Sequence, residues 1–169
     1  MVKSNNLKEF LNLKVNQYNN PDFIKDDPIQ IPHLFNKKED IEISGFLTST
    51  IAWGNRKSII NSSKKMMGLL KNKPYDYIMN HNERDLKKLT QYVHRTFNGY
   101  DLIQFISSLK NIYQNHGGLE KIFSENIKDN SLHYSIHNFK KVFFEIEHLP
   151  RTQKHVSDPY KGSAAKRIN

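Results

Sequence analysis

The chain contains no cysteine and no long apolar run, and each absence excludes a class of protein. Without cysteine there is neither a disulfide framework nor a zinc site built from thiolates. No stretch of about 18 apolar residues occurs that could cross a bilayer as a helix, and the first residues lack the apolar core of a secretory signal peptide. We therefore expect a cytoplasmic protein that is not embedded in a membrane.

Glycine and proline are also scarce, with 7 and 6 in 169 residues. They form no flexible linker that would divide the chain, and no repeat or low-complexity tract is present. Hydrophobic residues make up 37% of the chain, and a chain of this length can bury about 70% of its unfolded surface. The sequence predicts one globular domain over residues 1–169.

Acidic residues are few relative to basic ones, 17 against 26, which gives a net charge of +9. Such a charge favours a polyanionic partner such as DNA, because cations placed against phosphates release counterions. A lysine-rich composition with abundant asparagine and isoleucine is equally typical of A/T-rich coding, so the total charge leaves nucleic-acid binding open. The distribution says more, since residues 151–169 hold five basic residues against Asp158 alone.

Apolar residues recur at helical spacing almost throughout, and no convincing period-two run is bounded by hairpin turns. The pattern predicts an all-α fold with a buried central helix over Glu39–Trp53 and a last amphipathic helix over Leu132–Leu149. Because residues before proline avoid helical backbone, Asp26–His33 is expected to be an extended arm. The other predicted helices cover 7–18, 55–70, 74–79, 82–89, 98–116 and 119–123.

Several helix starts are predicted from single residues. Asn55, Asn82 and Asn98 are each expected to be N-caps, because an asparagine side chain can accept a bond from a free amide of the first turn. Asp101 follows Asn98 by three residues, which indicates a capping box. Gly117 and Gly118 are expected to end the helix that begins there.

Metal and nucleophile motifs are weak. His133 and His137 lie one helical turn apart, but the glutamate that follows the first histidine of a zinc-peptidase motif is missing. There is no serine elbow and no glycine-rich phosphate loop. We therefore expect neither a metal nor a cofactor. The two histidines are expected to be a solvated pair.

Two basic turns remain as candidates for binding phosphate. Trp53 is followed by Gly54, Asn55, Arg56 and Lys57, which either face phosphate or serve as a helix cap with solvated cations. Near the end of the chain, Gly162 and Ser163 precede Lys166 and suggest the start of a helix. A lysine becomes nucleophilic when burial or a neighbouring cation lowers its pKa. The spacing alone favours a solvated Lys166.

Five segments together resemble a bacterial family known as domain of unknown function 2400. They are Asp27–His33, Ile41–Phe46, Ala52–Lys57, Val93–Gly99 and Asp158–Arg167, and the resemblance covers essentially the whole chain. The family is distantly similar to the helix-hairpin-helix DNA glycosylases. That similarity implies a glycosylase-like helical fold, in which a glycine-rich hairpin binds phosphate and a helix-borne lysine attacks the sugar of a flipped nucleotide.

By this resemblance Lys166 is the candidate catalytic lysine, Gly162 the first hairpin glycine and Arg167 the neighbour of the lysine. Ala164 occupies the place of the second hairpin glycine, and Asn55 is a candidate wedge beside the flipped base. The predicted nucleic-acid-binding residues are Lys154, Lys161, Gly162, Ser163, Arg167, Asn55 and Arg56.

The resemblance also implies a continuation through a long helix that begins at residues 166–169 and carries on to an aspartate that assists the lysine. We therefore expect this chain to be an N-terminal fragment that is inactive by itself. Three hypotheses stay open for the parent protein. They are a DNA glycosylase or lyase-like enzyme, a non-catalytic helical protein that binds nucleic acid, and a structural or interaction module.

Overall fold

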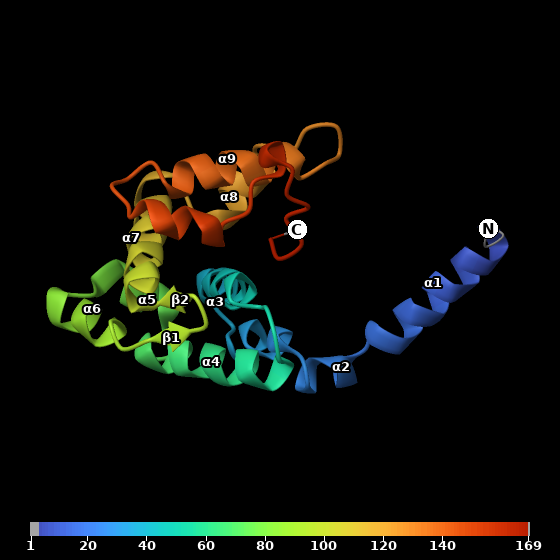
Figure 1. The fold of residues 1–169 in the computed structure, drawn as a ribbon, viewed down its shortest axis with the longest axis horizontal. Helices are drawn as coiled ribbons and strands as arrows, with labels where there is room; N and C mark the ends of the chain where they lie inside the picture. The colour runs from blue at the N-terminus through green and yellow to red at the C-terminus, as the bar shows by residue number, and fades with distance from the viewer. Residues whose placement is uncertain (1–3, 169) are drawn as a thin grey trace.

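The chain folds into two groups of helices joined by one long helix, as the computed structural model of residues 4–168 shows (Figure 1). One group contains α3, α4, α5, α6 and a small hairpin, and the other contains α8, α9 and a 3-10 helix. Helix α7 contacts α5 and α6 in the first group and α9 in the second. The helices are α1 (Ser4–Tyr18), α2 (Pro21–Lys25), α3 (Lys38–Thr50), α4 (Arg56–Leu69), α5 (Pro74–Asn80), α6 (Glu83–Leu89), α7 (Gly99–Asn115), α8 (Leu119–Ser124) and α9 (His133–Phe143).

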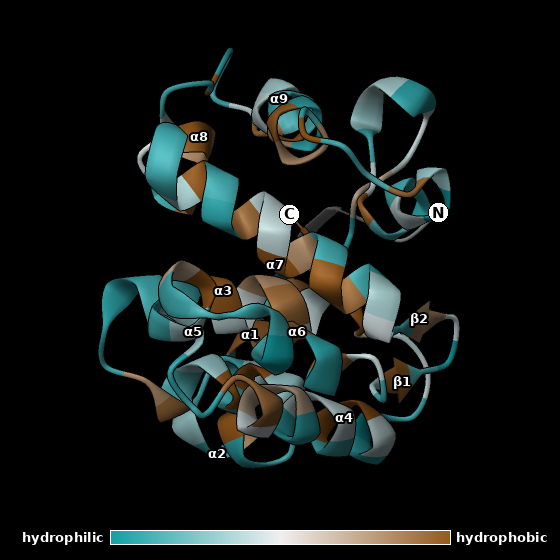
Figure 2. Ribbon diagram, turned by 90° about the vertical axis from the view of Figure 1, so that its left-hand side faces the viewer, coloured by the Kyte–Doolittle hydropathy of each residue, from teal (hydrophilic) through white to brown (hydrophobic). Residues whose placement is uncertain are grey.

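Helix α3 is the buried central helix that the sequence predicts. Ile43, Phe46 and Leu47 recur at helical spacing and are buried. The ring of Phe46 lies 5.7 Å from that of Phe105 on α7 and 5.2 Å from that of Phe139 on α9. The apolar core is therefore continuous between the two groups of helices, and Figure 2 shows apolar residues facing this shared interior.

The predicted helix caps are confirmed. The side chain of Asn55 accepts a bond from the amide of Ser58 at 3.2 Å, and Asn82 caps α6 in the same way. Asn98 and Asp101 form the predicted capping box, in which each side chain accepts from the backbone amide of the other, at 3.2 and 3.0 Å. These caps fix where α4, α6 and α7 begin.

The fold is mostly helical, but the expectation of no strands is corrected by a short hairpin. Strand β1 (Val93–His94) pairs antiparallel with β2 (Phe97–Asn98). Arg95, in the turn between them, has a left-handed backbone with φ 53°. Two residues per strand are too few for a period-two pattern to be visible in the sequence.

The expected extended arm at 26–33 is also corrected. It forms two 3-10 helices, η1 (Pro28–Gln30) and η2 (Pro32–Leu34). Ile31 has helical backbone, with φ −68° and ψ −54°, although Pro32 follows it. Its side chain is fully buried, and its amide bonds to the carbonyl of Pro28 at 3.0 Å. Burial of Ile31 and this bond offset the steric cost that usually keeps a residue before proline extended.

Helix α9 ends at Phe143, six residues before the predicted Leu149. Beyond it, the carboxylate of Glu145 pairs with Asn111 on α7 and with His116, the residue that caps the end of α7. These contacts take the chain off the axis of α9. Pro150 then begins another 3-10 helix, η3 (Pro150–His155), instead of closing α9. The apolar period continues through Ile146, and for this reason the helix predicted from the sequence is too long.

The C-terminal segment turns instead of starting a helix within the described residues. After the 3-10 helix η4 (Pro159–Lys161), Gly162 is left-handed with φ 77° and Ala165 with φ 47°. Residues 166–168 form a turn, and Asn169 of the expected helix lies outside the described residues. Figure 1 shows this segment descending from the group that holds α9 toward α3.

Helix α1 projects away from the rest of the molecule (Figure 1). The sequence predicts this helix, yet its apolar residues Leu7, Phe10 and Leu11 are about half exposed. The core is therefore built without α1.

Candidate functional site

A pocket of about 590 Å³ opens where η1 and η2, α3, the start of α4 and the C-terminal segment meet. Its size is typical of sites that hold a small organic ligand. Much of its wall is apolar, and charged side chains come from three separate parts of the chain. The lining residues are Asp27, Pro28, Ile29, Pro32, Gly45, Thr48, Ser49, Ala52, Gly54, Arg56, Ile59, Lys166 and Arg167.

Three of these residues are cations, and the sequence predicts all three as site residues. Arg56 is at the first position of α4, and Lys166 and Arg167 are in the C-terminal segment. Lys166 is exposed. The guanidinium of Arg167 donates to the carbonyl of Thr50 at 3.0 Å, which attaches the C-terminal segment to the end of α3. The fold thus brings cations more than a hundred positions apart in the sequence to one cavity.

Asp27 is the carboxylate of the pocket, and sequence reasoning did not single it out. Its side chain caps η1 by accepting from the amide of Ile29 at 3.0 Å. It also lies 3.5 Å from the guanidinium of Arg56. An aspartate before a proline is a common helix cap, so the local sequence indicates a structural role for Asp27 and does not indicate a pocket.

Thr48 contributes a buried hydroxyl that has no hydrogen-bond partner in the part of the chain that the structure describes. The residue is only 4% exposed and lines the pocket. Its neighbours Ser49 and Thr50 both donate to the carbonyl of Phe46, each at 2.9 Å. An unpaired buried hydroxyl costs free energy, so Thr48 is suited to bond to a ligand.

Trp53, the one tryptophan of the chain, lies beside the pocket. The guanidinium of Arg167 is 4.8 Å from the centre of its ring, which is a cation–π distance. The ring of His155 is nearly parallel to it, with centres 6.1 Å apart, and His94 meets it edge-on at 5.6 Å. Trp53 therefore joins the C-terminal segment, the hairpin and η3.

A buried carboxylate fixes η3 beside Trp53. Asp101 is fully buried and accepts from the hydroxyl of Thr152 at 3.2 Å, and Arg151 lies at the same distance. His155 is 3.4 Å from this carboxylate. Burial lowers the pKa of His155, while the charge of Asp101 acts in the opposite direction. The imidazole is consequently neutral near pH 7.

The start of the C-terminal segment is held by α9. Asp158 bonds to His137 at 2.9 Å and caps η4 through the amide of Tyr160 at 3.0 Å. Burial acts to raise the pKa of the Asp158 carboxyl, but the bonds from His137 and Tyr160 outweigh it and lower that pKa. The Tyr160 ring lies against both His133 and His137, so the two histidines are not simply a solvated pair.

The remaining predicted residues do not line this pocket. Asn55 is exposed and its side chain serves as the cap of α4. Lys161, Gly162 and Ser163 are exposed in the turn that leads into the pocket. Lys154 lines a smaller neighbouring pocket.

Arg95 was not predicted as a site residue. Its guanidinium lies so close to Gly54 that any Cβ there would collide with it. Gly54 lines the pocket, so the hairpin adds a further cation near it.

Two absences hold for residues 4–168. No group of three or more histidine, aspartate or glutamate side chains there is placed to hold a metal ion. No helix among these residues combines the length and the apolar character needed to span a membrane.

The fold and pocket define a class, a mostly helical protein with a cation-lined pocket closed by its C-terminal segment. Residues 27–169 match the family described as "Protein of unknown function (DUF2400)", and the chain belongs to it. The match begins beyond α1 and α2 and includes every residue that lines the pocket. No curated protein and no solved structure matches the chain.

Proposed function

We propose that this protein binds DNA through the pocket between α3, η1 and the C-terminal segment. The observation that carries the proposal is the convergence of Arg56, Lys166 and Arg167 on one largely apolar cavity. Apolar walls suit the faces of a nucleobase, and cations suit the phosphates on either side of it. The net charge of +9 supports the same partner.

The size of the pocket favours one unstacked nucleotide over a duplex. The cavity of about 590 Å³ is too small for a duplex, so a base must leave its stack to enter it. Pro28, Ile29 and Ile59 provide apolar wall. The unpaired hydroxyl of Thr48 can donate to or accept from a base edge. Single-stranded DNA is therefore the ligand to test first.

Binding is measured by fluorescence anisotropy with labelled single-stranded and duplex DNA over a range of salt concentrations. Each phosphate contact contributes about 0.7 to the slope of log affinity against log salt for single strands. We expect Arg56→Gln and Lys166→Gln each to reduce that slope by roughly this amount. Lys141→Gln, a change at an exposed lysine on α9, is the control and leaves the slope unchanged. A flat salt profile, or no binding at low salt, contradicts the proposal and favours an interaction module.

We propose as a second candidate function Schiff-base formation between Lys166 and abasic DNA, which Asp27 in the same pocket favours. The family resemblance implies that the acidic partner of Lys166 lies beyond this chain, and Asp27 is another candidate for that role. The amine would attack the C1′ aldehyde of an abasic deoxyribose, with loss of water, to give a Schiff base. Asp27 would accept the proton that the lysine ammonium must first lose.

Borohydride tests this reaction because hydride reduces the imine carbon and leaves a stable amine link between protein and DNA. We expect a covalent adduct with abasic DNA that is lost in Lys166→Ala and kept in Lys141→Ala, a change at an exposed lysine on α9 outside the pocket. If abasic DNA binds and no adduct forms, the protein binds without this chemistry and the second candidate is wrong.

A further inference from the structure

A second, smaller pocket of about 290 Å³ adjoins the first. It is lined by Trp53, Thr96, Lys154, His155 and Arg167. Two of these side chains are cations and two are aromatic, and no carboxylate is among them. Arg167 lines both pockets, so its side chain lies at the boundary between them.

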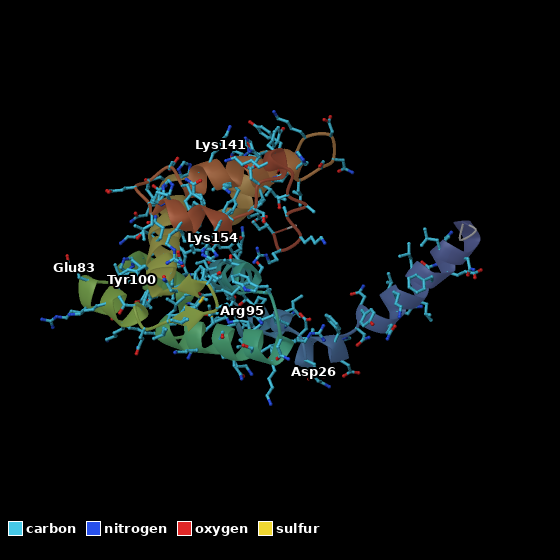
Figure 3. All side chains as sticks on the ribbon, in the orientation of Figure 1. Asp26, Glu83, Arg95, Tyr100, Lys141 and Lys154 are labelled. Atoms are coloured by element: carbon cyan, nitrogen blue, oxygen red, sulfur yellow. The ribbon has the colours of Figure 1, made fainter. Side chains whose placement is uncertain are left out.

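The smaller pocket lies between the two groups of helices. Trp53 follows α3 and Thr96 is in the hairpin turn, whereas Lys154 and His155 are on η3. Figure 3 shows Lys154 on the side of its group that faces Arg95 across the molecule, and Lys141 on the outer side. The pocket therefore lies between the hairpin turn and η3.

The walls of this pocket are held in place by contacts between η3, the hairpin and Trp53. Arg151 donates to the carbonyl of Thr96 at 3.0 Å and lies 3.2 Å from the buried carboxylate of Asp101. One side chain thereby connects the hairpin turn to η3. The Trp53 ring is held by His94 and His155. These contacts hold the hairpin turn, Trp53 and η3 together around the pocket.

We infer that the smaller pocket binds the nucleotide adjacent to the one in the larger pocket, an inference that rests on the proposed function. The base of this second nucleotide packs beside Trp53, whose ring already carries Arg167 at a cation–π distance and His155 in a parallel orientation. Lys154 contacts its phosphate, and Arg167 contacts the phosphate that links the two nucleotides. The ligand is a single strand of at least two nucleotides.

The single tryptophan makes the two pockets distinguishable. Oligothymidylates of one to four nucleotides are titrated while Trp53 fluorescence and calorimetric affinity are both recorded. We expect affinity to rise about 10-fold from one nucleotide to two, with quenching of Trp53 that begins at two. Lys154→Gln removes most of that gain and leaves the affinity for the mononucleotide unchanged, and Lys141→Gln changes neither quantity.

Trp53→Phe is expected to lower the affinity for the dinucleotide about 10-fold, because stacking on a smaller ring is weaker. Circular dichroism verifies that this variant is folded, and Lys154→Gln provides a test that leaves the core intact. Equal affinity for one and two nucleotides, or binding with no change in Trp53 fluorescence, overturns the second pocket while leaving the first. Absence of any binding overturns the proposed function itself.

Discussion

At the scale of single residues, α3 carries three consecutive hydroxyl side chains with different surroundings. Ser49 and Thr50 donate to a backbone carbonyl, whereas the buried hydroxyl of Thr48 bonds to nothing in the described chain. Burying a polar group without a partner costs about 1–3 kcal/mol, and a ligand that bonds to it recovers part of that cost. Substitutions at Thr48 and at Thr50 can therefore distinguish an effect on ligand binding from an effect on stability.

Thr48→Val is expected to leave the free energy of unfolding unchanged or to raise it by up to about 1 kcal/mol, because the valine removes an unpaired hydroxyl. The same change weakens DNA binding about 3- to 10-fold. Thr50→Val is the matched control, since it removes a hydroxyl that is bonded, and it lowers stability by about 1 kcal/mol without affecting binding. Urea unfolding and anisotropy measure the two effects, and weaker stability in Thr48→Val would show that its hydroxyl has a partner.

His155 provides a prediction about pH. Burial depresses its pKa below the ordinary histidine value of 6.5, so the unfolded chain takes up a proton that the folded chain resists. This residue's contribution to stability is complete above pH 6.5 and is lost as the pH falls through the depressed folded pKa. We expect His155→Gln to be less stable than the wild type at pH 7 and to lose less stability between pH 7 and pH 5. Chemical unfolding at several pH values checks this, and parallel curves would contradict it.

Residue roles that depend on nearby sequence could be predicted, and those that depend on the tertiary fold could not. Asn55 and the pair Asn98 and Asp101 were predicted correctly as caps, because a cap involves only the next three residues. Thr48 gave no signal, since its hydroxyl matters only through the pocket it lines. Lys166 was predicted as a site residue because of the family resemblance, since its spacing in the sequence alone favours a solvated side chain.

At the scale of elements, the start of α7 packs directly against the end of α6. A Cβ on Gly99 would fall on the backbone of Leu89 and Thr90, with the Cα of Thr90 only 2.5 Å away. Backbone atoms cannot move aside as a flexible side chain can. The close approach of these two helices therefore requires glycine at position 99.

Gly99→Ala is expected to lower the free energy of unfolding by roughly 2–4 kcal/mol, because α6 and α7 must separate to admit the methyl group. Gly68→Ala is the matched control, since nothing lies within 4 Å of a Cβ at that helical position. Alanine there raises stability by about 0.5–1 kcal/mol through helix propensity. Thermal unfolding compares the two, and similar effects would show that the helix contact is loose.

Element boundaries show why periodicity misled the sequence prediction in places. The apolar pattern continues past Phe143, yet α9 ends there because Glu145 bonds to α7. Ile31 adopts helical backbone before a proline because its side chain is buried. In both cases a contact between distant parts of the chain overrode a local preference, and a single sequence does not display such contacts.

At the scale of the whole molecule, one core joins both groups of helices and excludes α1. The apolar residues of α1 are about half exposed, and the family match begins at residue 27. An isolated helix of this length is marginal in water. The cooperative unit is therefore the part of the chain that follows α1.

Removal of residues 1–18 is expected to change the free energy of unfolding by less than about 0.5 kcal/mol and to leave DNA affinity within about two-fold. Urea denaturation and anisotropy measure the two effects on the shortened chain. A large loss of stability would show that α1 packs on the core in solution, and a large loss of affinity would place it at the DNA.

The mostly helical class and the central position of α3 followed from composition and periodicity, because both reflect how much apolar surface a helix must bury. The pocket could not be predicted from composition and periodicity, because its walls come from four separate segments. The basic tail was predicted to bind phosphate, but its approach to Arg56 and Asp27 depends on the whole fold.

The bond from Arg167 to the carbonyl of Thr50 joins residues 117 positions apart. Contacts of such long range form late in folding, because closing a large loop costs entropy that only a nearly complete structure offsets. The same contact can also open locally while the core persists, so the protein can lose the closed pocket without unfolding. Ligand occupancy would then be visible as slower amide exchange in residues 163–168.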